Sequence, residues 1–437
     1  MIQYIIKSFK PLQLLMYGYL LILLIGFGLL SLPFCQSTPV STIDNLFTAT
    51  SALSTTGLVT VNLPESYNFG GQLVILLLIQ IGGLGYMSIG SFIVLLTRSK
   101  LTNINFELIN YDFSLPENFN IKYFIRDLII STLLIELIGA VLLCLIFWQA
   151  GETNIVWNGI FHSVSAFCTA GLSLFSDSFV GYRDHFFLNF VISFLSIAGA
   201  LGFIVFTDLL ERFSGRKETI TFTSKIIIHF TFWGILLGAG VLFLSDATIA
   251  PLAPEKRILA SIFQSVAAFT TVGFNSYDIS GISSGPIFFM LLLMIVGASP
   301  AGTGGGMKST TVTALYAQLK STFRGSKDII YMNCKIPEHK IRLATSNFFF
   351  YVLVICIGTY LLLLVQPQDK FEVLFEAVSA LGTVGLSTGL TGDLSILGKI
   401  IIMVLMFLGR IGALSFGMIL FQSEHQATKI EEEDLAI

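Results

Sequence analysis

The chain contains the stretch Phe375-Glu-Ala-Val-Ser-Ala-Leu-Gly-Thr-Val-Gly-Leu-Ser387, and three similar stretches precede it. They read Phe47-Thr-Ala-Thr-Ser-Ala-Leu-Ser-Thr-Thr-Gly-Leu-Val59, Phe161-His-Ser-Val-Ser-Ala-Phe-Cys-Thr-Ala-Gly-Leu-Ser173 and Phe263-Gln-Ser-Val-Ala-Ala-Phe-Thr-Thr-Val-Gly-Phe-Asn275. Each copy has a Phe ten residues, an Ala five residues and a Thr two residues before a shared glycine. The four glycines are 114, 102 and 112 residues apart. This spacing indicates a fourfold internal repeat.

The composition is that of an integral membrane protein. Of the 437 residues, 54% are hydrophobic and only 12% are charged, against roughly 25% charged residues in soluble domains. The mean hydropathy is +0.82. The net charge of -3 comes without a dense basic patch, so we expect no binding of nucleic acid. Five cysteines without CxxC spacing favour small buried side chains over metal ligands or disulfides.

Eight apolar runs are long enough to span a bilayer, which takes about 20 residues. They cover residues 14–33, 72–96, 128–148, 186–210, 226–245, 286–307, 347–365 and 397–421. The first run is too long for the apolar region of a signal peptide, and no small-residue cleavage site follows it, so we expect a permanent span.

The distribution of lysine and arginine predicts the orientation. The segments before the first run and after every second run hold 17 of these residues, and the opposite side holds five. Lys308 and Arg410 lie within runs. Because basic residues stay on the cytoplasmic side, both termini are expected in the cytoplasm and the four Thr-x-Gly stretches outside.

Each repeat is expected to contain a span, a short re-entrant helix, a Thr-x-Gly stretch and a second span. We place the repeats at residues 1–100, 101–212, 213–324 and 325–437. Residues 44–54, for example, could form about three helical turns, too few to cross a bilayer. Irregular backbone at membrane depth must be buried in protein or line a water-filled path. One Thr-x-Gly could be an ordinary turn, but four copies between pairs of spans predict a pore.

The Thr-x-Gly chemistry suits a cation. Rings of backbone carbonyls can replace a hydration shell, glycine adopts the backbone angles that aim such carbonyls, and threonine adds an uncharged oxygen. The carbonyl end of the preceding half-helix favours positive charge. The expected ion filter comprises Thr55, Thr56, Gly57, Thr169, Ala170, Gly171, Thr271, Val272, Gly273, Thr383, Val384 and Gly385.

The fourfold pattern with single filter glycines resembles the Trk/Ktr/HKT superfamily of potassium transporters over essentially the whole chain. With no extra N-terminal spans, the chain is most similar to the Ktr-type membrane subunit. The resemblance implies an all-α membrane protein with four M1–P–M2 repeats around one pore, and potassium as the transported ion. In the sodium-transporting plant members a serine replaces the first-repeat glycine, so Gly57 implies potassium preference. A sodium-selective or potassium/sodium-coupled transporter is the alternative.

The sixth run is interrupted. Pro300 and five glycines fall within ten residues, which breaks a helix. A phosphate-binding loop would need a glycine before Lys308 and a strand before the loop, and neither is present. The resemblance implies a gate over residues 298–310. Its candidate residues are Ala298, Ser299, Pro300, Gly302, Thr303, Gly304, Gly305, Gly306 and Lys308.

Charged residues inside the runs are expected to have roles. An arginine at mid-membrane is costly, so Arg410 should face an aqueous cavity or pair with a neighbouring span. The resemblance implies a positive barrier beneath the filter that touches the gate. The position nine before each filter glycine is polar: Thr48, His162, Gln264 and Glu376. We interpret these as supports for the half-helices. The role of Glu136 stays open.

The resemblance also implies partners and a location. These are the plasma membrane, a second copy of the chain, and a separate cytosolic nucleotide-binding ring of the RCK type. Potassium is the expected ion, with sodium left open as an activator, and no organic cofactor is expected on this chain. Two other classes of membrane protein have different sequence signatures. A secondary transporter would show inverted repeats, and an intramembrane enzyme would show a catalytic constellation within the spans; the sequence shows neither, so we predict no enzyme activity.

Overall fold

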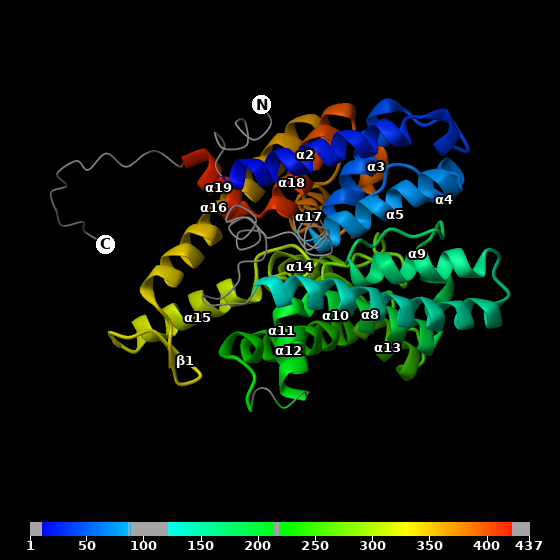
Figure 1. The fold of residues 1–437 in the computed structure, drawn as a ribbon. Helices are drawn as coiled ribbons and strands as arrows, with labels where there is room; N and C mark the ends of the chain where they lie inside the picture. Colours follow the sequence, from blue (N-terminus) through cyan, green and yellow to red (C-terminus); the bar gives the residue numbers. More distant parts are fainter. Residues whose placement is uncertain (1–10, 86–87, 89–120, 214, 216–217, 422–437) are drawn as a thin grey trace.

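The computed structural model of the protein describes residues 11–85, 88, 121–213, 215 and 218–421 (Figure 1). Several expectations lie outside these residues. They concern the end of the run 72–96, the ends of the first and last repeats, the start of the second repeat, and part of the basic residues that predict the orientation.

Four long helices begin the four units of the chain. They are α2 (Pro11–Leu30), α8 (Ile121–Ala150), α12 (Phe222–Ser245) and α16 (Glu338–Val365). By length and composition, four helices of the described chain can cross a membrane, or five if a bent pair is counted as one span. The expected all-α membrane fold is confirmed. A two-stranded hairpin, β1 (Ile330–Tyr331) with β2 (Cys334–Lys335), lies at one end of the molecule (Figure 1).

A short helix follows each long one. These half-helices are α3 (Thr42–Ser54), α9 (Ile155–Phe167), α13 (Pro254–Phe269) and α17 (Lys370–Leu381). Each ends one or two residues before a left-handed threonine of the Thr-x-Gly stretch. A β-branched residue with positive φ is strained by about 1–3 kcal/mol, and it cannot continue a right-handed helix. The expectation of short helices before the Thr-x-Gly stretches is therefore confirmed.

The second apolar run of each unit is not one straight helix. The segments are α5 (Phe69–Leu84), α10 (Phe186–Leu201) with α11 (Phe203–Phe213), α14 (Ser284–Ile295) with α15 (Ser309–Phe323), and α18 (Ile396–Ile411) with α19 (Ala413–Phe421). The axis bends by 94° between α10 and α11. Gly85, Gly202 and Gly412, which end the first segments, have φ of 76°, 84° and 91°. The sequence predicted spans over 72–96, 186–210 and 397–421 whose glycines have a milder effect than the break near residue 300. A helix nevertheless ends within each of these runs, because a left-handed glycine ends a right-handed helix.

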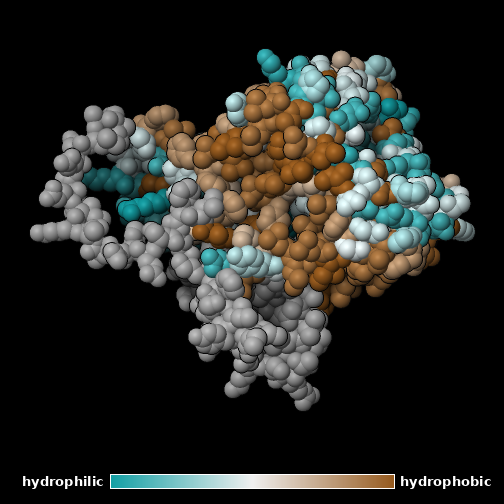
Figure 2. Space-filling model, turned by 90° about the horizontal axis from the view of Figure 1, so that it is seen from above, coloured by the Kyte–Doolittle hydropathy of each residue, from teal (hydrophilic) through white to brown (hydrophobic). Residues whose placement is uncertain are grey.

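Short elements complete the chain outside the half-helices. They are η1 (Pro33–Cys35), α4 (Leu63–Ser66), η2 (Val180–Tyr182) and η3 (Leu390–Asp393). A broad hydrophobic surface covers the face in Figure 2, bordered by hydrophilic residues at one end. Many large apolar side chains are exposed on α2, α8, α12 and α16. Such a surface suits hydrocarbon, because water would disfavour a patch of this size.

The units close into a ring. The second helix of each unit packs on the half-helix of the next: α5 on α9, α10 on α13, and α14 on α17. α18 packs on α3, which joins the last unit to the first. The half-helices therefore converge on one axis.

An ion pair fastens this last seam. Lys399 of α18 donates to Asp44 of α3 at 2.6 Å, and both side chains are about one-seventh exposed (13% and 14%). Ser41 and Thr60 also donate to Asp44, at 2.6 and 2.7 Å. Burial favours the neutral carboxyl, but the hydrogen bonds from Lys399, Ser41 and Thr60 outweigh it and hold the pKa of Asp44 below its ordinary value.

We predict that Asp44→Asn lowers the free energy of unfolding at pH 7 by about 1–3 kcal/mol, because Lys399 loses its charged partner. A depressed folded pKa stabilises the protein above the unfolded value of about 4, and this stabilisation is lost as the pH falls through the folded pKa. The melting temperatures of wild type and variant should therefore differ at pH 7, and the difference should shrink progressively as the pH falls below about 4. Asp393→Asn, at an exposed site on η3, is the control. Equal differences at every pH would contradict the prediction.

Candidate ion-conduction site

The four Thr-x-Gly stretches share one backbone geometry. The threonines Thr55, Thr169, Thr271 and Thr383 have φ of 53°, 50°, 60° and 47°. The glycines Gly57, Gly171, Gly273 and Gly385 have φ of 96°, 63°, 75° and 89°. All eight are thus left-handed, which is rare for threonine and easy for glycine. Because all four stretches adopt the same strained conformation, we infer that they have the same function.

These stretches form a closed ring. A Cβ added at Gly57 would overlap the carbonyl oxygen of Ala170 in the next unit. A Cβ at Gly171 would overlap that of Val272, one at Gly273 that of Val384, and one at Gly385 that of Thr56. Two constraints therefore require glycine at each of these positions: the positive φ, and the carbonyl that leaves no space for a side chain. Because the contacts run from the first unit through the fourth and back, the stretches surround a single axis.

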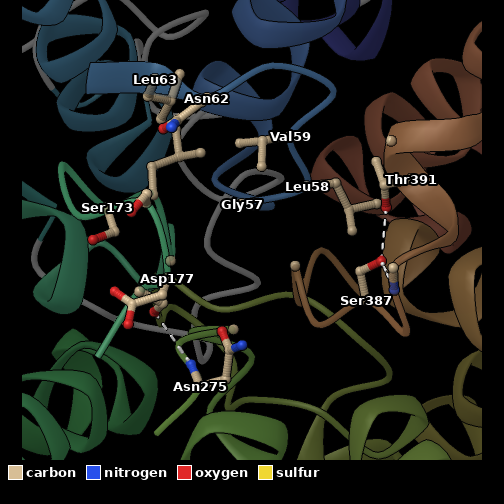
Figure 3. A pocket seen from close by; sticks show the side chains of 18 of the residues that line it. Gly57, Leu58, Val59, Asn62, Leu63, Ser173, Asp177, Asn275, Ser387 and Thr391 are labelled. Carbon is tan, nitrogen blue, oxygen red and sulfur yellow. Dashed lines mark hydrogen bonds between the residues drawn. The ribbon is translucent and has the colours of Figure 1, made fainter. Parts of the chain in front are cut away.

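An outer cavity of about 530 Å³ opens on one side of this ring. Its lining includes all four glycines (Figure 3). Ser173 and Asp177 lie on one side of the cavity, and Ser387 and Thr391 lie on the opposite side. The lining thus offers hydroxyl groups and an exposed carboxylate, Asp177, to a solute approaching the ring.

An inner cavity of about 620 Å³ lies on the other side, lined by residues of α15, α16 and α18 and by the glycine-rich loop. This loop, residues 296–308, connects α14 to α15. Arg410 and Lys308 are the charged residues of the lining that belong to the expected gate.

The glycine-rich loop lies directly against the threonines of the ring. Thr169 Oγ1 is 3.2 Å from Thr303 Oγ1, and Thr303 Oγ1 donates to the Phe167 carbonyl at 3.0 Å. The Gly305 amide donates to Thr271 Oγ1 at 3.0 Å. A Cβ at Gly305 would overlap the Thr383 hydroxyl. The loop therefore meets three of the four threonines, and glycine at position 305 allows its approach to Thr383.

Arg410 completes the contact at the remaining threonine. Its Nη1 donates to Thr55 Oγ1 at 3.2 Å and to the Thr303 carbonyl at 2.6 Å. Its Nη2 donates to the carbonyls of Gly82 and Gly83, the latter at 3.2 Å. These partners are hydroxyl and carbonyl oxygens, so within the described residues Arg410 has no salt bridge to a neighbouring span. The guanidinium joins the fourth unit, the first unit and the loop.

The glycines at the ends of the second helices allow this close packing. A Cβ at Gly82 would overlap the carbonyl of Leu53 in the same unit's half-helix, and Gly199 and Gly409 lie in the same way against Phe167 and Leu381. The first and last glycines have different roles in Gly82-Gly-Leu-Gly85, Gly199-Ala-Leu-Gly202 and Gly409-Arg-Ile-Gly412. The first glycine leaves space for the half-helix, and the last one ends the second helix.

A serine six residues before the glycine supports the ring and was missed in the sequence. Ser51 Oγ accepts from the Gly57 amide at 3.1 Å, and Ser379 Oγ accepts from the Gly385 amide at 3.1 Å. Ser165 Oγ donates to the Leu172 carbonyl at 2.7 Å. The third unit has Ala267 instead. The aligned serines were visible as a pattern, but only the fold shows what they touch.

The polar residues nine before each glycine differ from the expectation. His162 contacts the Asn158 carbonyl within its half-helix, but its Nε2 also lies 3.0 Å from Ser173 Oγ, beyond the glycine. Glu376 accepts from Ser387 and, at 2.8 Å, from Thr391. Both residues therefore hold the segment that follows the Thr-x-Gly stretch. Gln264 is fully buried, and its amide atoms have no hydrogen-bond partner among the residues that the structure describes.

Residues 21–432 match the family model described as TrkH, cation transport protein. The chain belongs to this family. The potassium/sodium uptake protein NtpJ of Enterococcus hirae is 33% identical, and the alignment covers 99% of this chain and 98% of that protein. The Ktr system potassium uptake protein B of Bacillus subtilis is 34% identical over 93% of this chain and 92% of its own length. These matches confirm the predicted membership of the Trk/Ktr superfamily.

The crystal structure of the potassium transporter TrkH from Vibrio parahaemolyticus has the same fold, with a TM-score of 0.72. The match covers 92% of this chain and 84% of that chain at 21% identity. The chain is therefore a multi-pass membrane protein of a cation transport family, and the prediction that it is not an enzyme is confirmed by the family.

We predict that Arg410→Ala raises cation flux, because it removes the donors that hold the glycine-rich loop to Thr55 and to the end of α5. Uptake of radioactive rubidium into liposomes should rise several-fold at equal protein content. Arg324→Ala, at an exposed position at the end of α15, is the matched control. Unchanged or reduced uptake in Arg410→Ala would refute the prediction.

Proposed function

We propose that this chain is the ion-translocating subunit of a Ktr-type uptake system, which passes potassium inward down its electrochemical gradient. The ring of carbonyls that lie against glycines carries the proposal. A dehydrating cation needs several oxygens at once, and rings of backbone carbonyls supply them without a fixed negative charge that would hold the ion too tightly. The twelve residues of the ring then act as the selectivity filter, with potassium bound at their carbonyl and threonine oxygens.

The names of the relatives support potassium. The Bacillus subtilis relative is named as a potassium uptake protein, and the structural neighbour is titled a potassium transporter. Gly57 supports the same ion, because the sequence retains the glycine that the sodium-transporting plant members of the superfamily replace by serine.

In this proposal the glycine-rich loop and Arg410 form the gate. Residues 298–310 would have to leave the filter threonines before an ion could reach the inner cavity. The contact of Thr303 with Thr169 joins the third unit to the second, and that of Gly305 with Thr271 lies within the third unit. Both support this role, since each is a single hydrogen bond. Net energies of about 1 kcal/mol for each such bond would allow release.

The proposal includes partners and a location. We place the chain in the plasma membrane as a homodimer, with both termini in the cytoplasm and four repeats at residues 1–100, 101–212, 213–324 and 325–437. A separate nucleotide-binding ring of the RCK type would act on the cytosolic face. The exposed apolar surface supports the lipid environment, and the Ktr-system names of the relatives support a multi-component assembly.

A second candidate is combined potassium and sodium uptake. The Enterococcus hirae relative is named as a potassium/sodium uptake protein. Sodium could share the filter or act only as an activator. Separate potassium and sodium fluxes into liposomes that contain the purified chain distinguish these functions from potassium uptake alone. A higher potassium flux supports the main proposal, and equal fluxes would support the second.

We predict that Gly57→Ser lowers the ratio of potassium to sodium flux at least several-fold. A side chain at residue 57 would overlap the Ala170 carbonyl, and its φ of 96° strains any residue other than glycine. Competition of potassium and sodium against rubidium uptake gives the ratio. Gly28→Ser is the control, because a Cβ there meets nothing within 4 Å. An unchanged ratio in Gly57→Ser would remove this residue from the filter.

A further inference from the structure

A carboxyl group lies buried behind the second unit of the ring. Glu136 sits in the middle of α8, and 6% of the residue is exposed. Its Oε2 accepts from Gln80 Nε2 at 3.1 Å, and its Oε1 accepts from Cys168 Sγ at 3.7 Å. A carboxyl at this depth is costly unless its oxygens are hydrogen-bonded, and here both oxygens have partners.

The two partners of Glu136 come from different units. Gln80 belongs to the last turns of α5 in the first unit, and Cys168 caps α9 in the second. The two also touch each other, with Cys168 Sγ 3.8 Å from Gln80 Oε1. A Cβ at Gly83 would overlap the Cys168 side chain. Glu136 therefore closes a tightly packed contact across the seam between the first and second units.

The contact of Glu136 with Gln80 and Cys168 lies directly behind the place where the glycine-rich loop meets the ring. Cys168 directly precedes Thr169, whose strained backbone (φ 50°) and hydroxyl meet Thr303 of the loop. On the other side of the seam, the end of α5 accepts the hydrogen bonds of Arg410. The segment Cys168–Thr169 thus contacts Glu136 on one side and the glycine-rich loop on the other.

The third unit shows that the fold does not need this carboxyl. Ser163 donates to the Glu136 backbone carbonyl at 2.7 Å, and in the third unit Ser265 donates in the same way to the Ile235 carbonyl at 2.8 Å. Ser163 and Ser265 occupy the same place in their repeats. Glu136 and Ile235 are therefore structural equivalents. The same helix-to-half-helix hydrogen bond forms in both units, and of the two only the second carries an acid at this position.

We propose that Glu136 is a positioning residue for the second quarter of the filter. It holds Thr169 in place through Cys168 and Gln80, and so fixes both the carbonyl ring at this unit and its contact with the loop. The inference rests on the proposed function and assigns a specificity-determining role to a residue outside the ring.

The experiment measures the ratio of potassium to sodium flux in liposomes for Glu136→Met and Glu136→Gln. Methionine has a similar length but accepts from neither partner, whereas glutamine retains one carbonyl oxygen. We expect the ratio to fall at least threefold in Glu136→Met and by an intermediate factor in Glu136→Gln. Glu65→Met, the same change at an exposed site, should leave the ratio as in wild type.

The path through Cys168 is tested by a double-mutant cycle. Cys168→Ala should lower the ratio as Glu136→Met does, and the double variant should fall no further than the lower single variant. A flux ratio is independent of protein amount, so a merely structural loss of folded protein would not move it. If Glu136→Met fails to fold, the ratio of potassium to sodium flux in Glu136→Gln tests the inference instead. A wild-type ratio in the folded variants, or multiplied effects in the double variant, would overturn the inference.

The same data separate this inference from the proposed function. A wild-type protein without preference for potassium would refute potassium selectivity and with it the inference. A selective wild type with an unchanged Glu136→Met variant would refute only the role of Glu136.

Discussion

The structure depends on four contacts between a glycine and a carbonyl oxygen of the next unit. A single methyl group at any of these glycines would overlap the neighbouring backbone, so the ring can close only where side chains are absent. Closure in turn requires the half-helices to converge, the second helices to pack on the following unit, and α18 to return to α3. The Asp44–Lys399 pair fastens the one seam that the chain itself does not connect.

The ring carries backbone strain that its surroundings offset. Four left-handed threonines at about 1–3 kcal/mol each make this arrangement unfavourable in isolation. Serines of the half-helices bind the Gly57 and Gly385 amides, Glu376 and His162 hold the segments beyond the ring, and Arg410 and the glycine-rich loop support the threonines from within. The four units have the same backbone conformation in the ring, but their contacts around the ring differ. We interpret the equal part as selecting the ion and the unequal part as controlling its passage.

Much of the fold was predictable because its signals are local. Apolar length identified the long helices, and the repeat identified the half-helices and the Thr-x-Gly stretches. The breaks at Gly85, Gly202 and Gly412 were underestimated, because a lone glycine in an apolar run often continues a helix. At Gly202 the left-handed φ accompanies packing against the glycine-rich loop, where a Cβ would overlap the Pro300 carbonyl. The aligned serines were missed in the sequence, because their hydrogen bonds to the ring exist only in the folded chain.

The sequence by itself determined the membrane class, the fourfold repeat and the residues of the Thr-x-Gly stretches, since composition, length and period are properties of a linear chain. Only the tertiary structure decided which carbonyl lies against which glycine, that Arg410 reaches Thr55 and Thr303, and that Glu136 meets Gln80 and Cys168. These contacts join residues up to 355 positions apart, and no local pattern encodes them, because they exist only once four helical units have closed around one axis.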